Sequence, residues 1–95
     1  MQVYATIRDL GSIAAEYVED IDQYHVWMCD KSSALNNISI FFKKSNTPGT
    51  HLFTTEGGTH GLTILDDGQQ IVVYSEDRAK VLELAHAITT VEDQS

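Results

Sequence analysis

Hydrophobic and polar positions alternate along three short stretches of the chain: residues 2–7 (QVYATI), 24–29 (YHVWMC) and 38–43 (ISIFFK). A period of two is typical of β-strands, whose successive side chains point to opposite faces of a sheet. Aromatic and β-branched residues, which strands favour, are frequent in all three stretches. We therefore predict three strands, with Val26 and Met28 on one face of the second. Ile38, Ile40 and Phe42 share one face of the third.

The period changes between residues 10 and 21. Apolar residues recur there at the i, i+3, i+4, i+7 spacing of a single helix face: Leu10, Ile13, Ala14, Tyr17, Val18 and Ile21. Asp9 or Ser12 can accept hydrogen bonds from the free amides of a helix N-terminus, and Gly11 weakens the first turn. The pattern predicts an amphipathic helix in this segment.

Residues 51–55 (HLFTT) predict a short strand, and residues 62–75 predict a β-hairpin. Asp67 and Gly68 are placed to form its turn, because both tolerate a positive φ. This turn fixes the register and predicts the core-facing pairs, Leu62 with Val73 and Ile64 with Ile71.

A second amphipathic helix is predicted after Ser75, whose hydroxyl is placed to cap the N-terminus. Its apolar face comprises Val81, Leu84, Ala85, Ile88 and Val91. Residues 92–95 are polar and are predicted to fray.

These elements predict a single α+β domain over residues 1–95. The predicted fold is an antiparallel sheet of about five strands with two amphipathic helices packed on one face. A chain of 95 residues buries only a modest core. A deep, enclosed active site would compete with that core for the same apolar side chains.

The net charge of −8 narrows the choice of partners. A field of this sign repels nucleic-acid phosphates and anionic lipids and attracts basic protein surfaces. We therefore expect a basic protein partner and no direct contact with nucleic acid or membrane. Cys29 is the single cysteine, and no apolar run reaches about 18 residues. No basic-then-apolar leader opens the chain, so a cytoplasmic location is predicted.

Acidic side chains concentrate in residues 16–24 (EYVEDIDQY). Carboxylates steer a basic partner toward a surface and tyrosines anchor it. Acids at the C-terminal end of a helix also oppose its dipole, which favours a role other than helix stability. With the acids of the hairpin turn, the predicted partner-binding residues are Glu16, Tyr17, Glu19, Asp20, Asp22, Tyr24, Asp66 and Asp67. The alternative is a solvated surface that only maintains solubility.

Residues 55–61 (TEGGTHG) are rich in glycine and histidine but match no ligand motif. A P-loop needs a lysine followed by a helix, and a dinucleotide fingerprint needs its third glycine to open a helix. His25 and Cys29 lie roughly 13 Å apart along a strand, too far to chelate one ion. We predict no catalytic residue, no metal site and no cofactor, and take 55–61 as a surface loop with His60 as its one chemically active side chain.

The order of elements around ISIFFKK and IVVYSEDRAKVLELAHAI, within residues 35–90, resembles small immunity proteins of polymorphic toxin systems. That resemblance implies a non-enzymatic inhibitor that binds a toxin. Small acidic inhibitors carried by phages against host defence systems have the same physical profile.

The function predicted from the sequence is a non-catalytic acidic binding protein that inhibits or neutralises a basic partner, either a toxin or a nucleic-acid-handling complex. The first alternative is a structural protein that self-associates through a sheet edge, with 2–7 and 51–55 as the edges and a homodimer left open. The second is a small ligand-binding protein or enzyme that uses the 55–61 loop.

Overall fold

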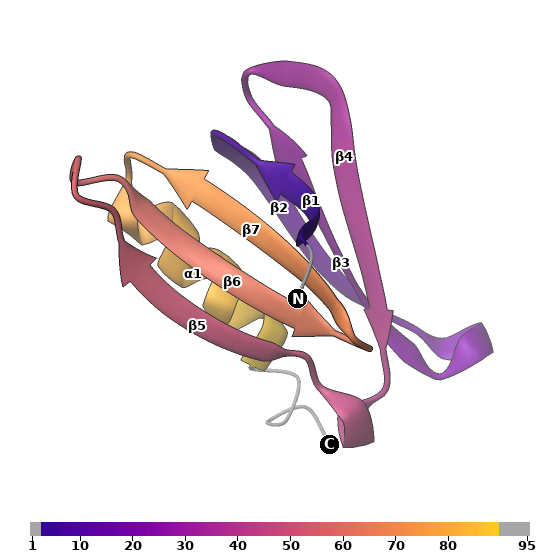
Figure 1. The fold of residues 1–95 in the computed structure, drawn as a ribbon. Coiled ribbons are helices and arrows are strands. Elements are labelled where there is room, and N and C mark those ends of the chain that lie inside the picture. The colour runs from indigo at the N-terminus through magenta and orange to yellow at the C-terminus, as the bar shows by residue number, and fades with distance from the viewer. Residues whose placement is uncertain (1–2, 90–95) are drawn as a thin grey trace.

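The computed structural model describes residues 3–89, which form seven strands and one α-helix (Figure 1). A four-stranded sheet has the order β1–β7–β6–β5 and consists of β1 (Val3–Ile7), β5 (Gly49–Thr54), β6 (His60–Asp66) and β7 (Gln69–Ser75). A three-stranded sheet has the order β2–β3–β4 and consists of β2 (Leu10–Val18), β3 (Gln23–Asp30) and β4 (Ser33–Phe42). The remaining elements are the 3-10 turns η1 (Glu19–Ile21) and η2 (Lys44–Asn46) and the helix α1 (Arg78–Thr89).

The predicted fold, one antiparallel sheet of about five strands under two helices, is wrong. The strands divide into two sheets, and the described residues contain one α-helix. The pairing of β1 with β7 is also parallel rather than antiparallel. Parallel pairing needs a long connection between its strands, and here most of the chain lies between β1 and β7.

The error in the fold class arises from residues 10–21, which form β2 and η1 instead of a helix. The pairing of β2 with β3 shifts register between Leu10 and Ile13, so the period of two that identifies a strand is interrupted. Gly11 and the β-branched Val18 are weak helix formers, and a helix this short is marginal on its own in water. Backbone pairing with β3 therefore decides the conformation.

The core lies on one face of the four-stranded sheet, which we call the inner face. It is covered by α1, seen behind β5, β6 and β7 in Figure 1, and by the three-stranded sheet. The buried core residues are Ile7, Leu10, Val26, Met28, Ile38, Ile40, Phe42, Leu62, Ile64, Ile71, Val73, Val81, Leu84 and Ile88. The predicted faces of β3 and β4 and the hairpin register, Leu62 with Val73 and Ile64 with Ile71, are confirmed.

The cap of α1 differs from the prediction. Ser75 is the last residue of β7, and its Oγ accepts a hydrogen bond from the amide of Asp77 at 3.0 Å. The carboxylate of Asp77 accepts from the amide of Ala79 at 3.0 Å, so Asp77 is the side chain that caps the helix. Val91 and residues 92–95 lie outside the described residues.

The buried carboxylate of Asp30 links the β1–β2 connection to the β3–β4 connection at one end of the core. Asp30 is only 4% exposed and accepts hydrogen bonds from the amides of Arg8 at 3.0 Å and Ser32 at 2.8 Å, and from Nδ2 of Asn36 at 3.4 Å. Burial alone would raise the pKa of this carboxyl. The amide donors outweigh burial and hold the pKa of Asp30 below its usual value.

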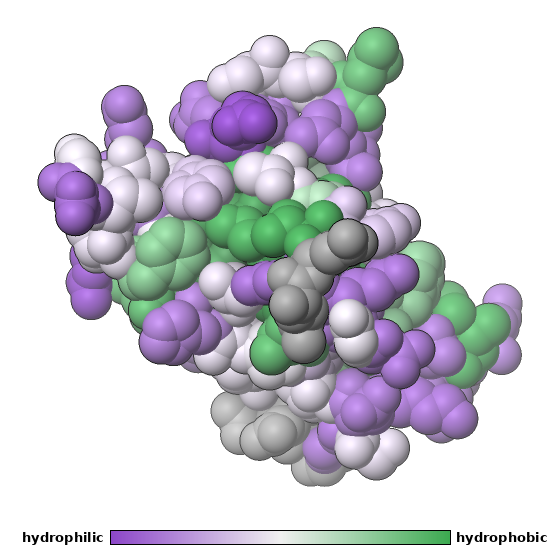
Figure 2. Space-filling model, viewed as in Figure 1, coloured by the Kyte–Doolittle hydropathy of each residue, from purple (hydrophilic) through white to green (hydrophobic). Residues whose placement is uncertain are grey.

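The opposite face of the four-stranded sheet, the outer face, carries no helix (Figure 1). In the same view, Figure 2 shows a hydrophobic band over β7 and β1 in the middle of this face. The two edges of this sheet are β1 and β5, so the predicted strands at 2–7 and 51–55 do lie at sheet edges.

Candidate functional site

The tip of the β2–β3 hairpin presents three consecutive exposed side chains, those of Glu19, Asp20 and Ile21. The turn is closed by Asp22, which adopts the left-handed conformation with φ 52°. Its amide donates a hydrogen bond to the carbonyl oxygen of Glu19 at 3.2 Å. Asp tolerates this conformation better than most residues. The tip thus displays two carboxylates beside an isoleucine that is 49% exposed.

Tyr17 is fixed to this tip by its hydroxyl. Oη of Tyr17 donates to Oδ1 of Asp22 at 2.6 Å, and this bond, with the nearby negative charges, raises the pKa of Tyr17 to about 12. The ring centroids of Tyr17 and Tyr24 are 5.1 Å apart, and Tyr24 stacks on the core residue Phe42 at 6.0 Å. Two of the predicted anchor residues therefore form an ordered aromatic row that reaches the core.

Glu16 projects from the face of the three-stranded sheet opposite to that of Tyr17 and Tyr24. It pairs across the strands with His25, and Oε1 of Glu16 lies 3.3 Å from Nδ1 of His25. The imidazole of His25 stacks on the ring of Phe41, with centroids 4.3 Å apart and planes 6° apart. Glu16 is thus held beside an exposed aromatic ring, since Phe41 is 48% exposed.

Asp66 and Asp67 form the tip of the β6–β7 hairpin, where Asp67 has φ 50° and Gly68 has φ 81°. Burial and the neighbouring charge of Asp67 raise the pKa of Asp66. A cleft of about 390 Å³ separates this tip from the start of β3 and the end of β4. Its lining residues are Gln23, Phe41, Phe42, Lys43, Asn46, Asp66, Asp67 and Gln69.

All eight predicted partner-binding residues therefore come from two hairpins that reach the same end of the molecule (Figure 1), where Gln23 of β3 lines the cleft with Asp66 and Asp67. We call this end of the molecule the acidic end. It comprises the two tips, the adjoining parts of β2 and β3, and the cleft between the β6–β7 tip and β3–β4. Its predicted partner-binding residues are Glu16, Tyr17, Glu19, Asp20, Asp22, Tyr24, Asp66 and Asp67. Within residues 3–89, none of its carboxylates forms an ion pair with a lysine or arginine. Most of these carboxylates thus remain available to a partner's basic side chains.

One premise behind the choice of these residues does not hold. Because β2 is a strand and η1 spans three residues, no helix dipole opposes the acids of residues 16–22. The structure also adds Ile21, Phe41 and Lys43, which were not selected from the sequence. A weak indication of Phe41 and Lys43 is present in the sequence. Both occupy the polar-side positions of an alternating strand, where an aromatic ring is unusual.

The segment 55–61 is an ordered hairpin connection between β5 and β6. The amide of Thr55 donates to the carbonyl of Thr59 at 2.9 Å, and the amide of Thr59 donates to Oγ1 of Thr55 at 3.1 Å. Gly58 adopts a φ of 89°, which a glycine accommodates without strain. His60 is the first residue of β6 and not part of the loop itself.

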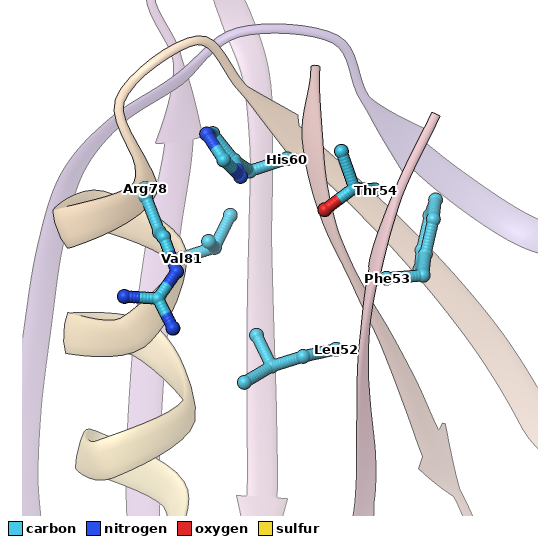
Figure 3. A pocket seen from close by; sticks show the side chains of 6 residues that line it. All are labelled: Leu52, Phe53, Thr54, His60, Arg78 and Val81. Atoms are coloured by element: carbon cyan, nitrogen blue, oxygen red, sulfur yellow. The ribbon is translucent and has the colours of Figure 1, made fainter. Parts of the chain in front are cut away.

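His60 lines a small cleft of about 150 Å³ between the β5–β6 hairpin and α1, shown in Figure 3. Leu52, Thr54, Arg78 and Val81 share the cleft, while the ring of Phe53 points to the other side of the sheet. Among residues 3–89, no carboxylate or thiol lines this cleft. The polar groups that share the cleft with His60 are the hydroxyl of Thr54 and the guanidinium of Arg78. Within residues 3–89, no three His, Cys, Asp or Glu residues are grouped to hold a metal ion.

Comparison with protein-family models, with curated proteins and with solved structures finds no match to this chain. No helix among the described residues has the length and apolar character needed to cross a membrane.

Proposed function

We propose that this protein is a non-catalytic binding protein whose acidic end inhibits or neutralises a basic protein partner. The observation that carries the proposal is the convergence of two separate hairpins, about 45 residues apart in sequence, on one end of the molecule. Both hairpins end in acidic residues, and their carboxylates lack lysine or arginine partners among residues 3–89.

The acidic end combines the two properties that protein recognition needs. Its unpaired carboxylates attract a basic surface over a distance and raise the association rate. Tyr17, Ile21 and Phe41 are 47%, 49% and 48% exposed and supply the apolar contact that slows dissociation. The cleft beside Phe41 has room for a lysine or arginine side chain of the partner, facing Asp66 and Asp67.

The partner class follows from this chemistry. Nuclease toxins and nucleic-acid-handling complexes carry basic surfaces because they bind phosphates, and an acidic surface can occupy the same region. The pattern-level resemblance to immunity proteins supports a toxin as the partner, and the phage inhibitor class is equally compatible. The proposal includes a cytoplasmic location, which the free thiol of Cys29 supports.

The experiment is an affinity pull-down from the native host with salt elution, followed by affinity measurement with the partner that is recovered. The test variant is Glu19→Lys with Asp20→Lys. The matched control is Glu56→Lys with Glu83→Lys, which changes the net charge equally at two exposed positions away from the acidic end. We expect the test variant to lose the partner and the control to keep it. Equal capture by both variants would refute the proposed surface.

A second candidate function is self-association through a sheet edge, and the position of β1 and β5 at the edges favours it. Nδ2 of Asn36 donates to the carbonyl of Thr6 at 3.1 Å, which occupies part of the β1 edge and leaves β5 as the more open one. Sedimentation should then show an oligomer that persists in high salt, because backbone pairing does not depend on charge.

A further inference from the structure

The outer face of the four-stranded sheet is free of formal charge in an otherwise highly charged protein. Three cross-strand rows make up this face, and their members follow from the strand register. They are Phe53, Gly61 and Tyr74 in the first row, His51, Thr63, Val72 and Thr6 in the second, and Gly49, Leu65, Gln70 and Val3 in the third. None of these residues is Asp, Glu, Lys or Arg, although such residues make up 21% of the chain.

Burial accounts for the absence of charge at Gly61 and Val72 but not at the four exposed positions of the face. Val3 and Leu65 are 48% and 44% exposed, and His51 and Gly49 are also exposed. Solvent-exposed strand positions of a monomer commonly carry Lys or Glu, which keeps sheets apart. Depletion of charge together with aromatic residues is instead the composition of a protein–protein interface core.

The face also carries an ordered aromatic pair in its first row. Phe53 and Tyr74 meet edge to face, with ring centroids 5.8 Å apart and planes at 90°. The hydrophobic band of Figure 2 runs alongside, over β7 and β1. Val72, in the middle row, is only 8% exposed. A second sheet can pack on such a surface at the usual separation of about 10 Å.

We propose that a second copy of this chain docks on the outer face, so that two four-stranded sheets pack face to face. Each copy carries a charge of −8, and two such molecules repel wherever their charged surfaces meet. The outer face is the sheet surface on which they can approach without juxtaposing like charges. A basic partner, by contrast, is drawn to the acidic end and gains no charge complementarity here.

The size of the face predicts a weak dimer. Four strands about 4.8 Å apart and about six residues long, at about 3.3 Å per residue, give a face of roughly 400 Å² per copy. That area is at the low end for specific association, so the dimer should be transient. A two-fold axis in the interface plane and perpendicular to the strands would put the two acidic ends at opposite ends of the dimer. This arrangement separates the charges most and leaves both acidic ends open.

The test is sedimentation equilibrium of the full chain from about 10 µM to about 1 mM, in about 50 mM and about 500 mM NaCl. The variants are Leu65→Lys and Thr63→Lys, which each place a lysine on the outer face. The matched control is Leu35→Lys, the same substitution at a leucine that is 95% exposed on β4. Circular dichroism confirms that each variant is folded.

We expect the wild type to dimerise and the dimer to tighten in high salt, because salt screens the repulsion between the two negative copies. Leu65→Lys and Thr63→Lys should each weaken dimerisation at least tenfold, although each reduces the net negative charge. Leu35→Lys should leave it unchanged. A wild type that stays monomeric at about 1 mM in high salt overturns the inference, as does a dimer that survives both outer-face lysines or is lost in Leu35→Lys.

This inference does not rest on the proposed function. Partner binding at the acidic end weakens with salt, whereas the dimer strengthens, so failure of one leaves the other intact. A dimer that survives the outer-face lysines would instead favour edge pairing through β5.

Discussion

The ring of Phe53 lies directly over the backbone of Gly61 on the neighbouring strand. A Cβ atom at Gly61 would overlap Cζ, Cε1 and Cε2 of this ring, and the ring in turn meets Tyr74. Glycine in a strand interior weakens the strand unless something needs the space, and here the aromatic side chain covers it. The buried state of Gly61 follows from this contact.

Gly61→Ala should therefore destabilise the protein, because the Phe53 ring must leave its position over the strand. We expect a loss of about 1–3 kcal/mol in the free energy of unfolding, as in other overpacked sites. For a domain of this size each kcal/mol corresponds to a fall of roughly 4–8 °C in Tm. Thermal denaturation checks the value.

The matched control is Gly57→Ala. A Cβ there would have Oγ1 of Thr55 as its nearest neighbour at 3.9 Å, and Gly57 does not have a positive φ. Its Tm should be unchanged or slightly raised. Equal stability of the two variants would show that the Phe53 ring moves aside without cost.

Asp30 should make stability depend on pH in the acid range. Its pKa is lower in the folded state than in the unfolded chain, so its contribution is present above the unfolded pKa of about 4 and is lost as pH falls through the folded value. Asp30→Asn removes this contribution and leaves at least one amide of Arg8 or Ser32 poorly paired. The cost at pH 7 should be roughly 1–3 kcal/mol.

Urea unfolding from pH 7 to about pH 3 measures this effect. The gap between wild type and Asp30→Asn should narrow as the wild-type carboxyl becomes protonated. Asp20→Asn, at an exposed position on the β2–β3 tip, should change stability little at any pH. A constant gap across the pH range would contradict the hydrogen-bonding role assigned to the charged form of Asp30.

Tyr17 should ionise with a pKa of about 12, well above its usual value of 10.0, because its hydroxyl donates to Asp22. Asp22→Asn removes the carboxylate and should bring the pKa of Tyr17 down toward 10.0. Ultraviolet titration of tyrosinate absorbance follows this change, and Tyr17→Phe identifies which step of the curve belongs to Tyr17. An unchanged titration in Asp22→Asn would mean that the hydrogen bond is not kept in solution.

The sequence correctly predicted the strands in which the alternation of apolar and polar residues matches the alternation of buried and exposed positions. The alternation in β3 and β4 and the Asp67–Gly68 turn were interpreted correctly because one face of each strand is buried and the other is not. The failure at residues 10–21 has a physical cause. The register shift after Leu10 breaks the strand period, and the apolar spacing that remains imitates a helix.

The acidic end was only partly visible in the sequence. Residues 16–24 form a local concentration of acids that composition alone reveals. Their closeness to Asp66 and Asp67 depends on how the two sheets pack, which brings Gln23 at the start of β3 beside the β6–β7 tip. No local sequence pattern predicts that contact. The uncharged outer face has a similar origin, because its rows combine the consecutive strands β5, β6 and β7 with β1 from the other end of the chain.

Association at the acidic end should divide into a charge-dependent rate and a contact-dependent lifetime. Neutralising Glu19 and Asp20 as Gln and Asn should lower the association rate several-fold and reduce its salt dependence, because these carboxylates act mainly before contact. Ile21→Ser should leave the association rate unchanged and raise the dissociation rate, because Ile21 is 49% exposed at the tip and acts only once the surfaces meet.

Leu35→Ser is the control for loss of an exposed apolar side chain, since Leu35 is 95% exposed and outside the acidic end. Surface plasmon resonance with the captured partner separates the two rates. If Ile21→Ser and Leu35→Ser had the same effect, the apolar contact would not lie at the β2–β3 tip, and the carboxylates alone would have to account for binding.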